Sequence, residues 1–167
     1  MEIAIISDTH DNLENIKKTL EIIKEEEIKI ILHCGDVVHL ETLNKILTEF
    51  NGRVYLAIGN VDKDFSLFET IEKNKKTIQK KLKASEIYQR IKINNKKIAI
   101  SHFPDIAFKL AKENKYDFIF YGHLHKPLER KIGNTKIINP GNVAGLYYRA
   151  SFATLDLEND NLDLKIL

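Results

Sequence analysis

Seven side chains that could bind metal ions or transfer protons stand directly after short apolar runs of the chain. They are Asp8, His10, Asp36, Asn60, His102, His123 and His125. The pairs at positions 8/10 and 123/125 are each two residues apart, so an extended backbone points both members to one side. Glycines precede Asp36, Asn60 and His123 and allow a close backbone approach. Because ligands bind outside the carboxyl ends of strands in open α/β sheets, we expect the seven side chains to converge.

This set has more donors than one metal ion needs. A tetrahedral zinc site takes three or four ligands. Two ions about 3.5–4 Å apart that share one carboxylate would use all seven side chains. Nitrogen and oxygen donors without thiolate suit transition metals better than Mg²⁺ or Ca²⁺. We therefore expect two divalent transition metal ions as cofactors, with Mn²⁺ as the first choice and Ni²⁺, Co²⁺, Fe²⁺ or Zn²⁺ as alternatives.

The elements that would position these side chains follow from the alternation of short Ile/Val-rich runs with longer amphipathic ones, which indicates an α/β domain. In the first half, strands are predicted over residues 2–6, 28–33 and 53–58. Asp11 and Glu14 have the spacing of a capping box, and a helix should follow them. A second helix is predicted around residues 40–47, and a lysine-rich helix from Asp64 to about Ser85.

The second half of the chain has a more antiparallel pattern. Hairpins are predicted around Asn94-Asn95 and Gly133-Asn134, because such pairs favour two-residue turns. The predicted strands cover residues 88–93, 96–100, 117–121, 128–132, 135–138, 150–156 and 161–166, with a helix near Leu110. Roughly nine strands and three or four helices suit two stacked sheets with helices outside. The chain contains no linker, so residues 1–167 are expected to form a single domain.

Composition excludes several classes of protein. A length of 167 residues suits one domain. With 43% hydrophobic and 30% charged residues and a net charge of +2, the chain is neither disordered nor a dedicated DNA-binding protein. Its one cysteine excludes a disulfide framework and a multi-thiolate metal cage. The apolar runs are shorter than the roughly 18 residues of a membrane span, and no signal peptide is visible, so we expect a cytoplasmic protein without a membrane partner.

The ordered motifs resemble those of one known family. Asp8-Thr9-His10, Gly35-Asp36, Gly59-Asn60, His102 and Gly122-His123-Leu124-His125 resemble the motifs of the calcineurin-like metallophosphoesterases. The short chain and Asn139-Pro140-Gly141 make it most similar to the small prokaryotic phosphodiesterases of that superfamily. The resemblance covers residues 2 to about 142. It implies a four-layer αββα sandwich, with two mixed β-sheets flanked by helices, and a dinuclear metal site at one edge.

The resemblance also implies a role for each residue. The first metal would be bound by Asp8, His10, Asp36 and His125, and the second by Asp36, Asn60, His102 and His123. Asp36 would bridge the two ions, and a metal-bridging water or hydroxide would attack a small phosphodiester. Asp36, Asn60 and His102 are the expected catalytic residues, and Asn60 and His102 would also bind the substrate. Asn142 is either a further polar contact for the substrate or part of a plain turn.

Position 61 departs from the family pattern. Many relatives have a histidine directly after the asparagine, and it is thought to protonate the leaving oxygen. Here Val61 follows Asn60, and valine cannot transfer a proton. The general acid is therefore unassigned, and we expect diesters, especially activated ones, to be preferred over monoesters.

Four other features have competing interpretations. His33, inside an apolar run, is expected to be a core or supporting histidine rather than a ligand. His39 is expected on a helix surface, with phosphate or ligand orientation as the alternative. Cys34 is expected to be a small buried residue, because Leu40 stands where the Cys-x5-Arg loop of cysteine phosphatases needs arginine. Tyr147-Tyr148, with Leu146, form either a dimer patch in a homo-oligomer or a pair on a sheet face.

The sequence is also compatible with three other functions. The lysines at 73, 75, 76, 80, 81 and 83 are expected to form a solvated helix face, with attraction of nucleic acid as the alternative that a nuclease would need. A phosphomonoesterase is a second alternative. A non-catalytic interaction module is a third, since the superfamily contains a retromer scaffold subunit with departures in its ligand set. All seven expected ligands are present here, which favours an enzyme.

Overall fold

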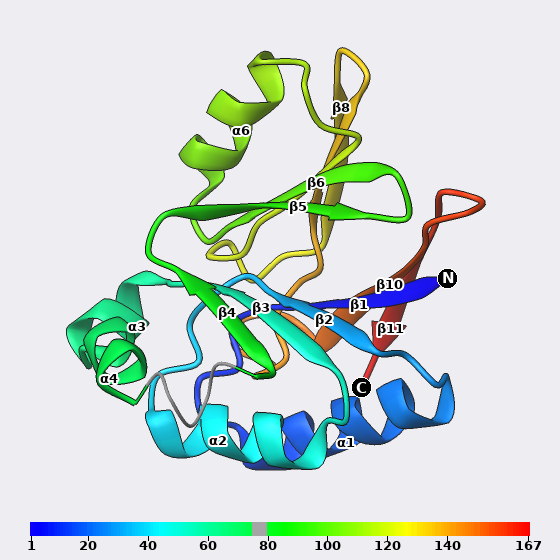
Figure 1. Cartoon of the computed structure of the whole chain (residues 1–167). Helices are drawn as coiled ribbons and strands as arrows, with labels where there is room; N and C mark the ends of the chain where they lie inside the picture. Colours follow the sequence, from blue (N-terminus) through cyan, green and yellow to red (C-terminus); the bar gives the residue numbers. More distant parts are fainter. Residues whose placement is uncertain (75–79) are drawn as a thin grey trace.

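Two β-sheets stack face to face, and helices cover their outer faces, in the computed structural model of the chain (Figure 1). The structure describes residues 1–74 and 80–167. The first sheet has six strands in the order β11-β10-β1-β2-β3-β4, and the second has five in the order β5-β6-β7-β9-β8. This arrangement confirms the expected two mixed sheets flanked by helices.

The first sheet is built around a parallel core. Its strands are β1 (Glu2–Ile6), β2 (Ile30–His33), β3 (Arg53–Ala57), β4 (Leu82–Ser85), β10 (Ser151–Asp156) and β11 (Asn161–Ile166). β1 to β4 run parallel, while β10 pairs antiparallel with β1 and β11 pairs antiparallel with β10 at the sheet edge. Parallel strands that are buried on both faces have continuous apolar sequences, and residues 3–6 of β1 are an example.

The second sheet combines hairpins with parallel pairs. Its strands are β5 (Tyr88–Ile93), β6 (Lys96–Ser101), β7 (Phe118–Phe120), β8 (Leu128–Ile132) and β9 (Thr135–Asn139). The predicted hairpins β5–β6 and β8–β9 are confirmed as antiparallel pairs. Asn94 and Asn95 have φ values of 46° and 63°, which a type I′ turn requires.

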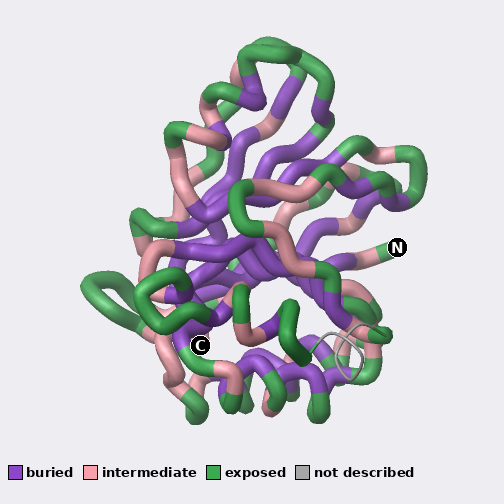
Figure 2. The backbone as a smooth tube through the Cα atoms, turned by 60° about the vertical axis from the view of Figure 1, so that its left-hand side comes forward, coloured by how far each residue is buried: buried purple, intermediate pink, exposed green. Residues whose placement is uncertain are grey.

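The helices divide between the two outer faces. They are α1 (Leu13–Glu25), α2 (Leu40–Glu49), α3 (Asn60–Asp64), α4 (Leu67–Lys73) and α6 (Pro104–Lys112). α1, α2 and α4 pack on the first sheet around residues such as Ile6 and Leu43. α6 packs on the second sheet around Ala99 and Ile119. A third apolar cluster, which includes Ile5 and Phe120, fills the space between the sheets. Figure 2 shows these buried strands in purple through the middle of the molecule.

The structure corrects three expectations about the elements. The lysine-rich helix predicted to about Ser85 ends at Lys73, and Leu82–Ser85 instead form β4 alongside β3. α1 is capped by Asn12, whose side chain accepts the backbone N–H of Asn15, rather than by Asp11. β6, β7 and β9 are parallel, whereas an antiparallel half was expected.

Within the described ranges 1–74 and 80–167, no helix combines the length and apolar character that crossing a membrane would need.

Candidate metal centre

All seven side chains singled out from the sequence lie at the same edge of the two sheets. β1 leads to Asp8 and His10, β2 to Asp36, and β3 to Asn60, which opens α3. In the second sheet β6 leads to His102, and β7 leads to the histidines at 123 and 125. The carboxyl ends of these parallel strands therefore bring donors from both sheets into one place.

One group of donors surrounds Asp8. The His125 Nε2 atom lies 3.2 Å from Asp8 Oδ1 and 3.4 Å from His10 Nε2. His10 Nε2 is also 3.7 Å from Asp36 Oδ2. The donor atoms of Asp8, His10 and His125 lie within 4.8 Å of one another. Bonds of about 2.0–2.2 Å from one ion would span such a set.

A second group surrounds Asn60. Its Oδ1 atom is 3.0 Å from His102 Nε2 and 3.1 Å from His123 Nδ1. His102 Nε2 is also 3.5 Å from Asp36 Oδ2. The Oδ2 atom of Asp36 therefore faces both groups, through His10 on one side and His102 on the other.

The hydrogen bond of His102 indicates which of its ring nitrogens is available to bind a metal ion. Its Nδ1 lies 2.8 Å from the carbonyl oxygen of Cys34, which can only accept a hydrogen bond, so the Nδ1 atom carries the proton. In the neutral ring, Nε2 then points a lone pair at the oxygens of Asn60 and Asp36. A cation between these facing acceptors would satisfy them, and metal-bound histidines commonly donate their other N–H to a carbonyl. The donor set fits a divalent metal.

The two carboxylates differ in their titration. Burial would raise the pKa of Asp8, but the hydrogen bond to His125 and the nearby His102 lower this pKa overall. Burial raises the pKa of Asp36, although His102 opposes the shift. The hydrogen bond to Asp8 raises the pKa of His125, while burial, followed by His102, lowers that of His123.

The loops that present these ligands contain an unusual number of left-handed residues. Asp8, Asp36, His123 and His125 have φ values of 52°, 57°, 68° and 57°. Val38 has φ 91°, which a β-branched residue adopts only under strain. Such conformations persist only where surrounding contacts fix them, and they concentrate at functional sites.

Asp62, to which the sequence pattern assigned no role, supplies such contacts for the loop after β2. Its fully buried carboxylate accepts the backbone N–H groups of Asp36, Val37, Val38 and Gly59 at 2.7–2.8 Å. This one side chain ties the loop after β2 to the start of α3. The available signal was an aspartate in the first turn of a helix, three residues after Gly59, but a capping pattern does not reveal partners in another loop.

The histidines outside the ligand set have separate roles. His33 is buried as expected: Gly35 N–H donates to its Nδ1, and its Nε2 lies 3.3 Å from the Thr9 hydroxyl, which in turn donates to the Asp36 carbonyl. Burial lowers the pKa of His33 to about 4. His39 is exposed at the start of α2 and pairs with Asp11 at 2.6 Å, which fits the expected helix-surface position.

Three further expectations have clear outcomes. Cys34 is buried as expected, and burial raises the pKa of its thiol. Asn142 was expected either to contact the substrate or to be part of a plain turn; its side chain is fully buried, donates to the His125 carbonyl and accepts from Leu146 N–H. This placement makes it a support for the His125 loop. Val61 donates its backbone N–H to Asp36 Oδ1, and its side chain offers no acid.

The lysine run is not one solvated helix face. Lys75 and Lys76 lie outside the described residues. Lys81 donates to the carbonyl oxygens of Leu47 and Phe50 at the end of α2, and Lys83 is part of β4.

The rim of the site is partly apolar. Tyr147 is 91% exposed, and its ring centroid lies 5.7 Å from that of His125. Leu124 is also exposed beside the ligands. Tyr147 and Tyr148 lie in the turn between β9 and β10, so the sheet-face interpretation of this pair is wrong.

Comparison with known families agrees with this geometry. The model of the calcineurin-like phosphoesterase superfamily domain matches residues 1–160. The chain belongs to the calcineurin-like phosphoesterase superfamily. It is therefore an enzyme of a metal-dependent phosphoesterase family, as the ordered motifs predicted.

Relatives of this phosphoesterase are found in sequence and in structure. It is 31% identical over 149 residues to the phosphodiesterase MJ0936 of Methanocaldococcus jannaschii, covering 87% of this chain and 86% of the relative. A solved structure of an archaeal phosphodiesterase, 28% identical, superposes with a TM-score of 0.88 over 100% of both chains. Vps29 of Entamoeba histolytica, solved with zinc, is 18% identical and shares the fold with a TM-score of 0.67 over 100% of this chain and 98% of its own.

Proposed function

We propose that this phosphoesterase hydrolyses small phosphodiesters with two divalent transition metal ions. Asp36 carries the proposal, because its Oδ2 atom lies 3.7 Å from His10 Nε2 and 3.5 Å from His102 Nε2. The first ion would be held by Asp8, His10, Asp36 and His125, and the second by Asp36, Asn60, His102 and His123. The phosphodiesterase names of the relatives support the choice of reaction.

The residues of the chain would prepare the site for substrate. Bound at these residues, divalent ions would supply positive charge to stabilise phosphoryl oxygens and to lower the pKa of an attacking water. The Val61 N–H donates a hydrogen bond to Asp36 Oδ1, which leaves Asp36 Oδ2 available to both proposed ions. The Cys34 carbonyl accepts a hydrogen bond from His102 Nδ1, so that in the neutral ring Nε2 is the atom that could bind a metal ion. Asn60 and His102 would also contact the phosphoryl group.

Two features support a diester as the substrate. Val61 cannot protonate a leaving oxygen, so an ester whose leaving group departs without a proton should react faster. The exposed ring of Tyr147 and the side chain of Leu124 provide an apolar rim that suits the second organic group of a diester.

Metal analysis combined with a substrate panel tests the proposal. Metal-free protein is loaded separately with Mn²⁺, Ni²⁺, Co²⁺, Zn²⁺ and Mg²⁺, and the hydrolysis of an aryl diester is compared with that of its monoester. We expect about two ions per chain, because the seven ligands form two groups that share Asp36, and a higher kcat/KM for the diester than for the monoester. His102→Ala should lose turnover and one ion, while the exposed His39→Ala should keep both.

Three results would contradict the proposal. They are binding of less than one ion per chain at saturating metal, a strong monoester preference, and no hydrolysis of any ester by the loaded protein. The last result would favour a non-catalytic interaction module.

A further inference from the structure

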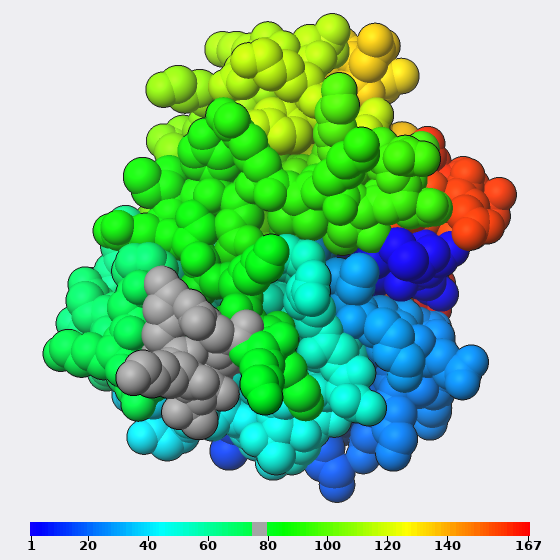
Figure 3. Space-filling model, viewed as in Figure 1, coloured from blue at the N-terminus to red at the C-terminus, as the bar shows by residue number. Residues whose placement is uncertain are grey.

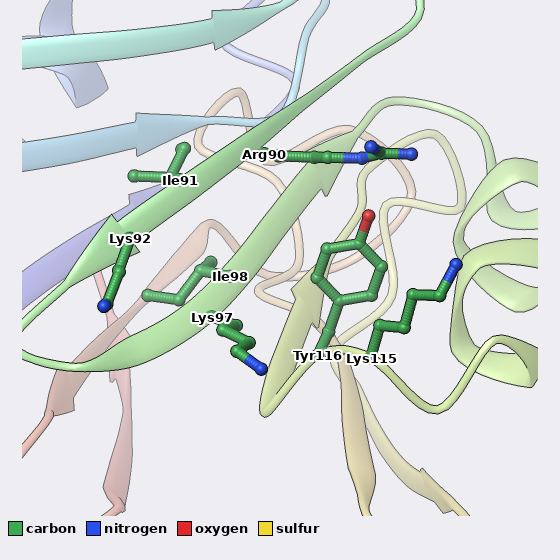
Figure 4. A pocket seen from close by; sticks show the side chains of 7 residues that line it. All are labelled: Arg90, Ile91, Lys92, Lys97, Ile98, Lys115 and Tyr116. Atoms are coloured by element: carbon green, nitrogen blue, oxygen red, sulfur yellow. The ribbon is translucent and has the colours of Figure 1, made fainter.

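A positively charged cavity lies at the opposite end of β6 from the candidate metal ligands. It has a volume of about 380 Å³ and is formed by the outer face of the β5–β6 hairpin and the segment before β7 (Figure 4). Lys97 stands at the start of β6 and His102 follows its end, so with a rise of about 3.3 Å per residue the two positions are roughly 17 Å apart. The cavity is therefore separate from the candidate metal centre.

Four cations line this cavity, and none of its lining residues is acidic. The cations are Arg90, Lys92, Lys97 and Lys115, and the remaining lining comes from Tyr116 and two isoleucines. Figure 4 shows the Tyr116 ring standing between the Arg90 and Lys115 side chains, with Lys92 and Lys97 on the hairpin beside them. In the space-filling view, β5 and β6 form the surface between the first sheet and the α6 layer (Figure 3).

The hairpin places two of these cations against each other. Lys92 and Lys97 are direct cross-strand partners in the antiparallel ladder, with Cβ atoms about 4.5–5.5 Å apart in such pairs. Like charges in this position are destabilising. Within residues 1–74 and 80–167, neither ammonium group has an ion-pair partner. An anion bound between them would remove the repulsion.

The nearby acids neutralise only part of this charge. Glu113 pairs with Lys115 at 3.2 Å, and the Asp117 carboxylate accepts the backbone N–H of Lys97. Arg90 stacks on Tyr88 and donates one N–H to the Tyr88 hydroxyl. Because a guanidinium has five N–H donors, this contact fixes the group and leaves donors for a ligand.

We propose that this cavity is a binding site for a small anion with two or more phosphoryl groups. The cations stand in two sets, Lys92 with Lys97 and Arg90 with Lys115, and a diphosphate group could reach both. Lysine and arginine bind phosphate oxygens through charge-assisted hydrogen bonds. Tyr116 is 8% exposed, so its ring offers little stacking area, and the site would recognise charge rather than a base.

Calorimetric titration with inorganic pyrophosphate tests the proposal on the metal-loaded protein. The double variant Lys92→Ala/Lys97→Ala should bind pyrophosphate at least tenfold more weakly than the wild type, about 1.4 kcal/mol by the standard conversion. It should stay folded, because it removes a repulsive pair. Lys17→Ala/Lys18→Ala, which changes the charge equally on the exposed face of α1, should bind within twofold of the wild type.

Further arms of the titration separate this site from other anion sites. His102→Ala should retain the cavity's pyrophosphate binding, because that substitution affects only the metal centre. ADP should bind more tightly than AMP. Equal binding by the wild type and Lys92→Ala/Lys97→Ala would overturn the proposal, as would loss of all binding in His102→Ala. A single-stranded oligonucleotide that binds more tightly than ADP and is weakened equally by both lysine pairs would also overturn it.

Discussion

The Asp62 side chain accepts four backbone N–H groups and holds the loop after β2 against the start of α3. Its two carboxylate oxygens each accept two backbone N–H groups. An amide in the same place would turn an NH2 group toward two donors. These bonds offset the left-handed conformations of Asp36 and Val38, so the geometry of the Asp36 carboxylate, the proposed bridge, depends on a residue outside the candidate ligand set.

Asp62→Asn should therefore weaken both folding and metal binding. Loss of bonds to a buried carboxylate costs about 1.5–3 kcal/mol each before relaxation, so we expect a loss of about 3 kcal/mol in the free energy of unfolding. Supporting residues of this kind change metal affinity by about 10–100-fold. Urea denaturation and metal titration measure the two effects. Asp105→Asn, on the exposed first turn of α6, is the matched control, and metal affinity of Asp62→Asn within threefold of the wild type would contradict this role.

His33 gives the fold a pH dependence of its own. Burial lowers its pKa to about 4, whereas the unfolded chain has a pKa near 6.5. Between these values the unfolded state binds more protons, so stability increases with pH and is lost as the pH falls from about 6.5 toward 4. Between pH 7 and pH 5 this linkage amounts to about 2 kcal/mol.

His33→Gln removes this titration. In metal-free protein, the wild type should lose about 2 kcal/mol more stability between pH 7 and pH 5 than His33→Gln, by the same linkage. Urea denaturation at both pH values gives the difference. Parallel stability curves for the two proteins would contradict the expectation, because they would show that the pKa of His33 is the same in the folded and unfolded states.

The seven candidate ligands could be found from the sequence because the signal is local to each strand end. A short apolar run followed by an Asp, Asn or His identifies each position without knowledge of the fold. Asp62 could not be found in this way, because three of its four partners lie 24–26 residues earlier in the chain. For Asn142 the sequence left a substrate contact and a plain turn open, because it does not reveal that this segment is buried against the His125 loop.

At the scale of the elements, the same limit explains the wrong prediction for residues 64–85. A helix was expected because Phe65, Phe68 and Ile71 recur at helical spacing; Phe68 and Ile71 do lie in α4, whereas Phe65 is the C-cap of α3. β4 has only four residues, with Leu82 buried, which is too short for a periodic signal. Pairing with β3 determines its conformation. Likewise, nothing in β6 or β7 alone distinguishes a parallel from an antiparallel partner.

Lys81, which precedes β4, connects this part of the chain to the end of α2. The last turn of α2 contains no basic residue of its own, and the Lys81 ammonium donates to the carbonyls of Leu47 and Phe50 at 3.1 and 3.0 Å. Lys81→Met should cost about 1–2 kcal/mol, because a charged donor at a helix C-terminus is lost. Lys45→Met, which breaks only an exposed pair with Glu49, should cost about 0.5 kcal/mol or less. Equal urea midpoints for the two variants would contradict the capping role.

For the whole molecule, the sequence predicted the layers well because hydrophobic patterning determines them. The alternation of Ile3 and Ile5 with Ala4 and Ile6 places one pair between the sheets and the other under the helices. The candidate metal centre uses this architecture directly. Asp8, Asp36 and Asn60 come from the first sheet, and His102, His123 and His125 from the second, so bound metal would join the two sheets across their shared edge.

Metal loading should therefore stabilise the entire fold rather than one loop. A ligand at 100 times its Kd that binds only the folded state adds about 2.7 kcal/mol. For a chain of this size, each kcal/mol raises Tm by about 2–4 °C, so Mn²⁺ should raise Tm by roughly 5–10 °C over protein in chelator. Calorimetry on the wild type, His102→Ala and His39→Ala tests this expectation. The increase should shrink in His102→Ala, which loses a donor from the second sheet, and persist in His39→Ala. An equal increase in all three proteins would place the stabilising ion outside this edge of the sheets.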